Sequence, residues 1–140
     1  MHFTIGGPYF DEYRDSDYAA FTWYPLLPEL AEWLDLYSRV ARGNGGEPDA
    51  GRRLLSWAHA AGFTTVTASS STWCFADPAD RAWWGGMWAE RVRESDLART
   101  AVDRGLASRA DLDRIARGWR RWADDPDGWL SILHGELICT

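Results

Sequence analysis

The sequence of 140 residues contains no lysine, so all fifteen of its basic residues are arginines. A catalytic Schiff base requires a lysine amine, and this absence therefore excludes that mechanism. The net charge of −6 argues against a nucleic-acid partner, because phosphates require a basic protein surface. No run of about 18 apolar residues is present, so we expect no membrane-spanning segment and no membrane partner.

Cysteine is also scarce, and the two that occur, Cys74 and Cys139, do not have the spacing of metal ligands. The sequence therefore predicts no metal site. We expect the two thiols at opposite ends of an antiparallel strand pair, roughly 30 Å apart and too far for a disulfide. Free thiols, and an N-terminus without a basic region followed by a long apolar one, predict a cytoplasmic protein.

Tryptophan, in contrast, is abundant, with ten residues, and hydrophobic residues make up 46% of the chain. This composition is typical of a globular protein, and a chain of this length can bury one core, so we expect a single domain over residues 1–140. The tryptophans either fill that core or line an apolar pocket for a planar ligand.

Two segments predict neighbouring strands of one sheet. β-branched and aromatic residues are concentrated in residues 63–74, directly after Gly62, a residue type that commonly ends helices. Residues 129–139 alternate imperfectly between apolar and polar side chains and form the second segment. Residues 2–5 predict one more short strand. We expect an α/β fold in which the intervening helices return over an end or a face of the sheet.

Apolar periodicity predicts helices over residues 29–42, 50–61, 78–94, 96–104 and 108–123. The side chains expected to face inward are Leu30, Leu34, Tyr37, Ala41, Leu54, Trp57, Ala58, Ala61, Trp83, Met87, Val92, Leu112, Ile115, Trp119 and Trp122, with Trp84 and Trp88 as further candidates. Expected N-caps are Asp49 and Asp77, and residues 108–111 resemble a capping box. The pair Gly85-Gly86 predicts either a kink or a close approach to the backbone, at a cost of about 2 kcal/mol relative to two alanines.

No catalytic motif is present, and individual polar residues carry two interpretations each. His134 lies inside the last predicted strand, either as a hydrogen-bonded structural residue or as a general acid or base that titrates near neutral pH. Arg52 and Arg53 either lie on the surface or hold an anionic group. The acidic cluster of Asp11, Glu12, Asp15 and Asp17 either forms a solvated face or binds hydroxyl groups of a ligand.

Several segments carry a family resemblance through their order along the chain. They are residues 14–18 (RDSDY), 21–25 (FTWYP), 44–54 (NGGEPDAGRRL), 61–63 (AGF), 77–88 and 125–129 (DPDGW). Together they resemble the C-terminal half of class I S-adenosylmethionine-dependent methyltransferases, with the ubiquinone/menaquinone-biosynthesis-like group as the nearest type. The resemblance covers residues 14–140 and leaves residues 1–13 unmatched.

The resemblance implies a partial Rossmann-like sheet. Strand five of that sheet would end near Asp17, strands six and seven would close it as an antiparallel pair, and residues 79–123 would cover the substrate side. The chain would be a truncated methyltransferase-like protein that contributes the small-molecule acceptor side of the transferase reaction. The residues that would form the wall of the acceptor pocket are Tyr18, Trp23, Tyr24, Arg52, Trp83, Trp84 and Trp88, with His134 as a more remote catalytic acid or base.

The family uses S-adenosylmethionine, which it holds with a glycine-rich loop and an acidic residue from its first half. The matched residues do not include that half, so no cofactor-binding residue carries over, and the chain would work beside a separate partner chain or without a cofactor. The alternative is a non-catalytic binding or interaction module that forms a homodimer or pairs through an exposed sheet edge.

Overall fold

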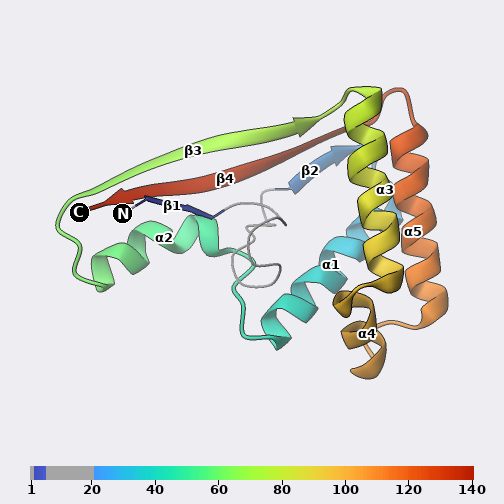
Figure 1. The fold of residues 1–140 in the computed structure, drawn as a ribbon, viewed down its shortest axis with the longest axis horizontal. Coiled ribbons are helices and arrows are strands. Elements are labelled where there is room, and N and C mark those ends of the chain that lie inside the picture. The colour runs from blue at the N-terminus through green and yellow to red at the C-terminus, as the bar shows by residue number, and fades with distance from the viewer. Residues whose placement is uncertain (1, 6–20) are drawn as a thin grey trace. The chain divides into compact units, whose positions relative to one another are not determined.

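The computed structural model describes residues 2–5 and 21–140 and shows a mixed α/β chain (Figure 1). Its elements in chain order are β1 (His2–Ile5), β2 (Phe21–Tyr24), α1 (Pro28–Gly43), α2 (Ala50–Ala60), β3 (Val66–Phe75), α3 (Pro78–Glu94), α4 (Asp96–Asp103), α5 (Arg109–Asp124) and β4 (Trp129–Cys139). The predicted helices and strands are thus confirmed, with small shifts at their ends. None of the helices in these ranges has both the length and the apolar character needed to cross a membrane.

Contacts divide the chain into two compact units that share continuous elements. The first contains β1 together with residues Ala41–Trp73 and Ser131–Thr140. The second contains Thr22–Val40 and Cys74–Leu130. Helix α1 and strands β3 and β4 each begin in one unit and end in the other, and the single domain expected from the length of the chain stays a prediction.

Strand β4 is the element with which each of the other described strands pairs. Strand β1 runs antiparallel to it, with His2 opposite Ile138 and Ile5 opposite Gly135. Just beyond β3 and β4, Thr65 and Thr140 exchange two backbone hydrogen bonds of 3.4 and 3.0 Å, the pattern of antiparallel pairing. The two strands predicted to be neighbours are therefore confirmed as neighbours.

In the first unit, α2 covers one face of the C-terminal half of β4. Leu54 and Ala58 of the helix are buried together with Leu137 and Cys139 of the strand. Because this contact uses residues four apart on α2, the rest of the helix faces away from it. Trp57, which was expected to face inward, is 42% exposed, and Ala61 is exposed as well.

The approach of α2 to β4 is closest at Gly135. A Cβ atom at this position would lie 2.6 Å from the carbonyl oxygen of Gly51, well inside van der Waals contact. Glycine is therefore required where the first turn of the helix crosses the strand.

In the second unit, α1, α3 and α5 share an aromatic core. Its fully buried rings belong to Trp33, Tyr37, Trp84, Trp88, Trp119 and Trp122. The Trp33 ring makes edge contacts with Trp88 at 4.7 Å and with Trp119 at 5.0 Å between centroids. These tryptophans fill the core, whereas Trp83, also expected to face inward, is 51% exposed.

Helix α3 continues through Gly85 and Gly86 without a break, so the kink is not observed and the close approach is. A Cβ atom at Gly85 would lie 2.8 Å from the Cβ atom of Ala123 and 2.8 Å from the carbonyl oxygen of Trp119, both on α5. A Cβ atom at Gly86 would meet nothing within 4 Å. Packing against α5 therefore requires glycine at position 85 but not at position 86.

The capping box at the start of α5 is confirmed. The Asp111 backbone N–H donates to Ser108 Oγ at 3.1 Å, and the Ser108 backbone N–H donates to Asp111 Oδ2 at 2.8 Å. Asp49 and Asp77 stand at the N-cap positions of α2 and α3, but neither side chain makes a capping hydrogen bond. The carboxylate of Asp49 instead lies 3.6 Å from the Arg42 guanidinium.

The two glycines of α3 give a matched pair of variants. Gly85→Ala should lower the free energy of unfolding by about 1–3 kcal/mol, because the new methyl group overlaps α5. Gly86→Ala should raise it by up to about 1 kcal/mol, because alanine favours a helix and the site is open. Urea unfolding followed by tryptophan fluorescence measures both, and equal effects of the two substitutions would contradict the packing of α3 on α5.

Candidate functional site

The first unit gathers polar side chains on one face of the β3–β4 pair. Ser69 Oγ donates to one carboxylate oxygen of Glu136 at 3.1 Å, and Ser71 Oγ donates to the other. His134 is two residues from Glu136 on the same strand and so shares its face. The Trp73 ring lies against the His134 ring, 4.4 Å away between centroids. These five residues are called the His134 cluster below.

His134 is the buried member of this cluster, with 1% of its surface exposed. Neither ring nitrogen makes a hydrogen bond of good geometry among the described residues, although the Ser71 backbone lies close enough to act on the imidazole. Whether His134 is a structural histidine or a general acid or base stays a prediction. A buried polar group without a well-formed hydrogen bond costs about 1–3 kcal/mol. The ring N–H groups of Trp88 and Trp119 in the aromatic core are in the same state, so this state alone does not mark a site.

The electrostatic surroundings keep His134 neutral. Burial lowers the pKa of its imidazole from the ordinary value of 6.5, because the charged form loses its hydration. The negative charge of Glu136 and the nearby backbone of Ser71 raise the pKa, but by less. A neutral imidazole has one ring nitrogen that can accept a proton, so His134 has the form required of a general base.

The residues of the expected pocket wall lie in different surroundings. Tyr18 lies outside the described residues. Trp83, Trp84 and Trp88 follow one another along α3, with centroids 6.1 and 6.3 Å apart. Trp84 and Trp88 belong to the aromatic core, whereas Trp83 lies at the surface.

The other expected wall residues are at least partly exposed. Trp23 is half-buried, and Tyr24 is 57% exposed, with its backbone carbonyl accepting a hydrogen bond from Trp122 Nε1 at 3.1 Å. Arg52 belongs to the first unit, is exposed, and lies 3.9 Å from Asp49. A shared role of these residues in acceptor binding stays a prediction.

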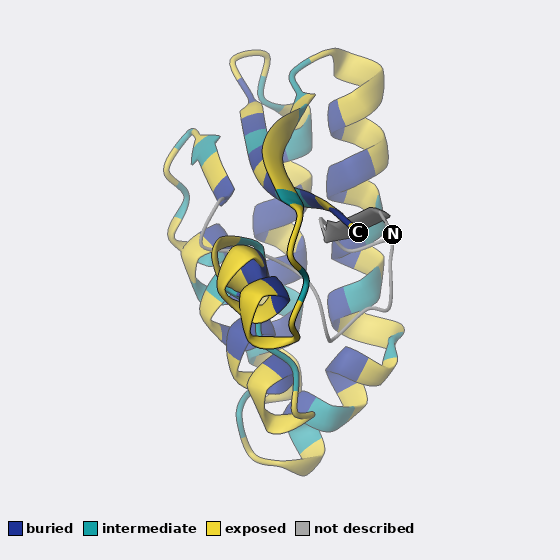
Figure 2. Cartoon of the chain, turned by 90° about the vertical axis from the view of Figure 1, so that its left-hand side faces the viewer, coloured by how far each residue is buried: buried dark blue, intermediate teal, exposed yellow. Residues whose placement is uncertain are grey.

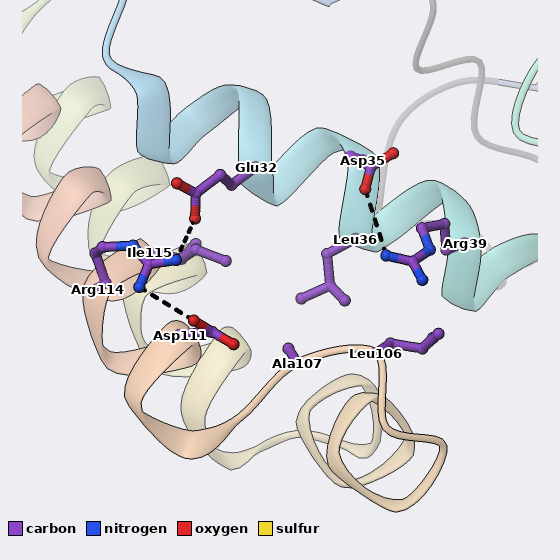
Figure 3. Close-up of a pocket in the computed structure, with 9 residues that line it drawn as sticks. All are labelled: Glu32, Asp35, Leu36, Arg39, Leu106, Ala107, Asp111, Arg114 and Ile115. Atoms are coloured by element: carbon purple, nitrogen blue, oxygen red, sulfur yellow. Dashed lines mark hydrogen bonds and ion pairs between the residues drawn. The ribbon is translucent and has the colours of Figure 1, made fainter.

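A hollow of about 210 Å³ lies in the second unit between α1 and the start of α5 (Figure 3). Its lining residues are Glu32, Asp35, Leu36, Arg39, Leu106, Ala107, Asp111, Arg114 and Ile115. Arg114 spans one side, with its guanidinium 2.7 Å from Glu32 and 3.1 Å from Asp111. Asp35 and Arg39 pair with each other at 3.7 Å.

The charges of this hollow satisfy one another. Hydrogen bonds from the backbone and side chain of Ser108 lower the pKa of Asp111, and Arg114 lowers it further. Glu32 and then Asp111 raise the pKa of the Arg114 guanidinium above its ordinary value. Each lining charge has an opposite partner, and the pair Arg114–Glu32 connects α5 to α1. The hollow is therefore a weaker candidate for a functional site than the His134 cluster.

Reasoning from the sequence missed most residues of the His134 cluster and of the hollow between α1 and α5. Ser69, Ser71, Trp73 and Glu136 were not singled out, because the serines and Glu136 are 65 or more residues apart and only strand pairing brings them together. The signal that could have found them was the predicted pairing of the two strands, extended to residue-by-residue register. In the hollow, the features visible in the sequence were the capping box at Asp111 and the inward-facing Ile115.

The architecture defines a mixed α/β protein with an antiparallel sheet, and no protein-family model matches the chain. The chain is 32% identical over 127 residues to a Schizosaccharomyces pombe protein named as an uncharacterized methyltransferase. The match covers 89% of this chain and 45% of that protein, so the chain spans less than half the length of this relative. The identity supports a relationship to methyltransferases.

The neutral, buried state of His134 predicts a pH dependence of stability. Below about pH 6.5 the unfolded chain binds a proton at this residue while the folded chain does not, so the free energy of unfolding falls with falling pH. His134→Gln should reduce the loss of stability between about pH 7 and 5, since it removes this proton uptake.

The matched control is His59→Gln, because His59 is exposed on α2. This variant should keep the wild-type loss of stability. Urea unfolding at a series of pH values measures all three proteins. A wild-type pH dependence in His134→Gln would contradict the lowered pKa of His134.

Proposed function

We propose that the chain contributes the small-molecule acceptor side of S-adenosylmethionine-dependent methyl transfer, within the class I, ubiquinone/menaquinone-biosynthesis-like group. The observation that carries this proposal is the 32% identity, over 89% of the chain, to a protein named as a methyltransferase. The end of the chain supports it, because β3 and β4 pair and α3, α4 and α5 lie between them in sequence. This is the order that the resemblance implies for the closing strands of the family.

The His134 cluster contains residues that could carry out the proton transfer in this proposal. Methyl transfer depends mainly on holding the acceptor atom in line with the methyl donor, and an acceptor hydroxyl must also lose its proton. Neutral His134 accepts that proton, and the Glu136 carboxylate stabilises the imidazolium that results. The Trp73 ring beside His134 offers a flat apolar contact to a planar acceptor.

S-Adenosylmethionine supplies the methyl group in this family, but the described residues do not fit a site for it. A nucleotide site of this type needs a glycine-rich loop that leads from a strand into a helix N-terminus. In residues 21–140, Gly45 follows helix α1, with φ +83°, and precedes α2. We therefore assign no described residue to the cofactor and propose that a separate partner chain holds it.

A second candidate function is a non-catalytic binding or interaction module. The observation that favours it is the exposure of β3, whose residues 67–72 are all exposed although the strand belongs to a sheet. A homodimer or another chain would pair with this strand.

Binding of phenol tests the acceptor side, because phenol combines a planar ring with an ionisable hydroxyl. We expect phenol to shift the NMR signals of the His134 and Trp73 rings in the wild type and in the His59→Gln control. The His134→Gln variant should lose the shift at Trp73. Unchanged Trp73 and His134 signals at saturating phenol in the wild type would contradict the acceptor site.

Calorimetry with S-adenosylmethionine separates the two candidate functions. Heat of binding, matched by S-adenosylhomocysteine and absent with ATP, favours a role in methyl transfer, but it places a cofactor contact on this chain and overturns the assignment of the cofactor to a separate partner chain. Absence of heat and of phenol binding, together with a doubled mass in light scattering, favours the interaction module.

A further inference from the structure

Strand β3 presents an open edge. Within the part of the chain that the structure describes, it pairs with β4 and with no other strand. Figure 2 shows β3 as a nearly continuous exposed ribbon. The free backbone N–H and C=O groups of such an edge are a template on which another strand can pair.

The hydrogen bonds between Thr65 and Thr140 show which backbone N–H and C=O groups of β3 point away from β4. Because these residues exchange both of their backbone bonds, Thr65 directs its N–H and C=O toward the β4 side. In an antiparallel ladder this direction alternates along the strand. The residues that direct their backbone groups away from β4 are therefore Val66, Ala68, Ser70, Thr72 and Cys74.

The edge lacks the features that usually protect one. Exposed edge strands commonly carry lysines or other charges, or a proline, which discourage pairing with a second chain. Residues 60–76 contain no charged residue and no proline. The described part of β3 is ten residues long, so the unprotected edge is also longer than an average strand.

We propose that β3 pairs antiparallel with β3 of a second copy of this chain, around a two-fold axis at Ser70. Ser70 is the midpoint of the outward-facing residues, so this register pairs every one of them. Val66 then lies opposite Cys74, Ala68 opposite Thr72, and Ser70 opposite Ser70 of the second copy. Any other register leaves outward residues unpaired.

The chemistry of the strand suits a second copy better than an unrelated chain. A two-fold interface must be complementary to itself, and a neutral strand brings no like charges together. The residues around the axis are small, with Ser69, Ser70 and Ser71 in sequence, so two copies can approach without steric conflict. The joined sheet would have β4 of each copy on either side of the central pair.

This inference deepens the second candidate function and names its partner. It does not depend on the His134 cluster, because His134 and Glu136 lie on β4 and project from a face of the sheet, while pairing uses the edge of β3. Phenol or cofactor binding can therefore fail while the dimer forms, and the dimer can fail while the acceptor site binds phenol.

Disulfide cross-linking tests the register, in a Cys74→Ser background that removes the exposed native thiol. In Ser70→Cys the two new thiols face each other across the axis, with Cα atoms about 5.5 Å apart, a distance that a disulfide spans. In the control Ala68→Cys the equivalent thiols are four residues apart along the strands, about 13 Å. Mild oxidation should cross-link Ser70→Cys at least ten times more than Ala68→Cys, as measured on non-reducing gels.

Light scattering over a concentration series tests the dimer itself. The wild type should have twice the mass of one chain. Ser70→Pro removes an outward N–H and should give a monomer that keeps its fold, because proline is tolerated at such positions of an edge strand. Ser70→Lys, which keeps the backbone donor but places like charges on the axis, should also give a monomer.

Three results would overturn the proposal. One is a single-chain mass of the wild type at every concentration. Another is equal cross-linking of the two cysteine variants. The third is a dimer that survives in Ser70→Lys with an unchanged circular dichroism spectrum.

Discussion

The pairing of β3 with β4 is the interaction on which the functional conclusions depend. It brings Ser69 and Ser71 onto Glu136 and the Trp73 ring onto His134, across long separations in sequence. The same pairing uses one edge of β3 and leaves the other open. One ladder of backbone hydrogen bonds therefore creates both a polar face and a free edge.

Glycines allow two close approaches between elements of the fold. Gly135 lets α2 cross β4 at van der Waals distance, and Gly85 lets α3 and α5 pack together. On α3, Trp84 and Trp88 are four residues apart and face the core of the second unit, whereas Trp83 points about 100° away from Trp84 and is exposed.

The proposed role in methyl transfer would give the His134 cluster a chemical function. A buried imidazole that its surroundings keep neutral is suited to accepting a proton. The match covers 45% of the relative, and the described residues contribute no cofactor loop. The proposed acceptor chemistry on a sheet face and the proposed association through a sheet edge are compatible, because they use different atoms of the same strands.

The sequence by itself determined the helices, the final strand pair, the capping box at Ser108 and Asp111, and the free thiols, because each depends on local propensity, on periodicity or on residue spacing. It also indicated His134 as a candidate acid or base, but it did not predict which residues surround His134. Only the tertiary structure decided that Trp57 and Trp83 face outward and that His134 is buried beside Trp73 and Glu136. Periodicity gives the direction of a side chain around its own helix or strand, whereas burial and partners depend on which distant segment packs against it.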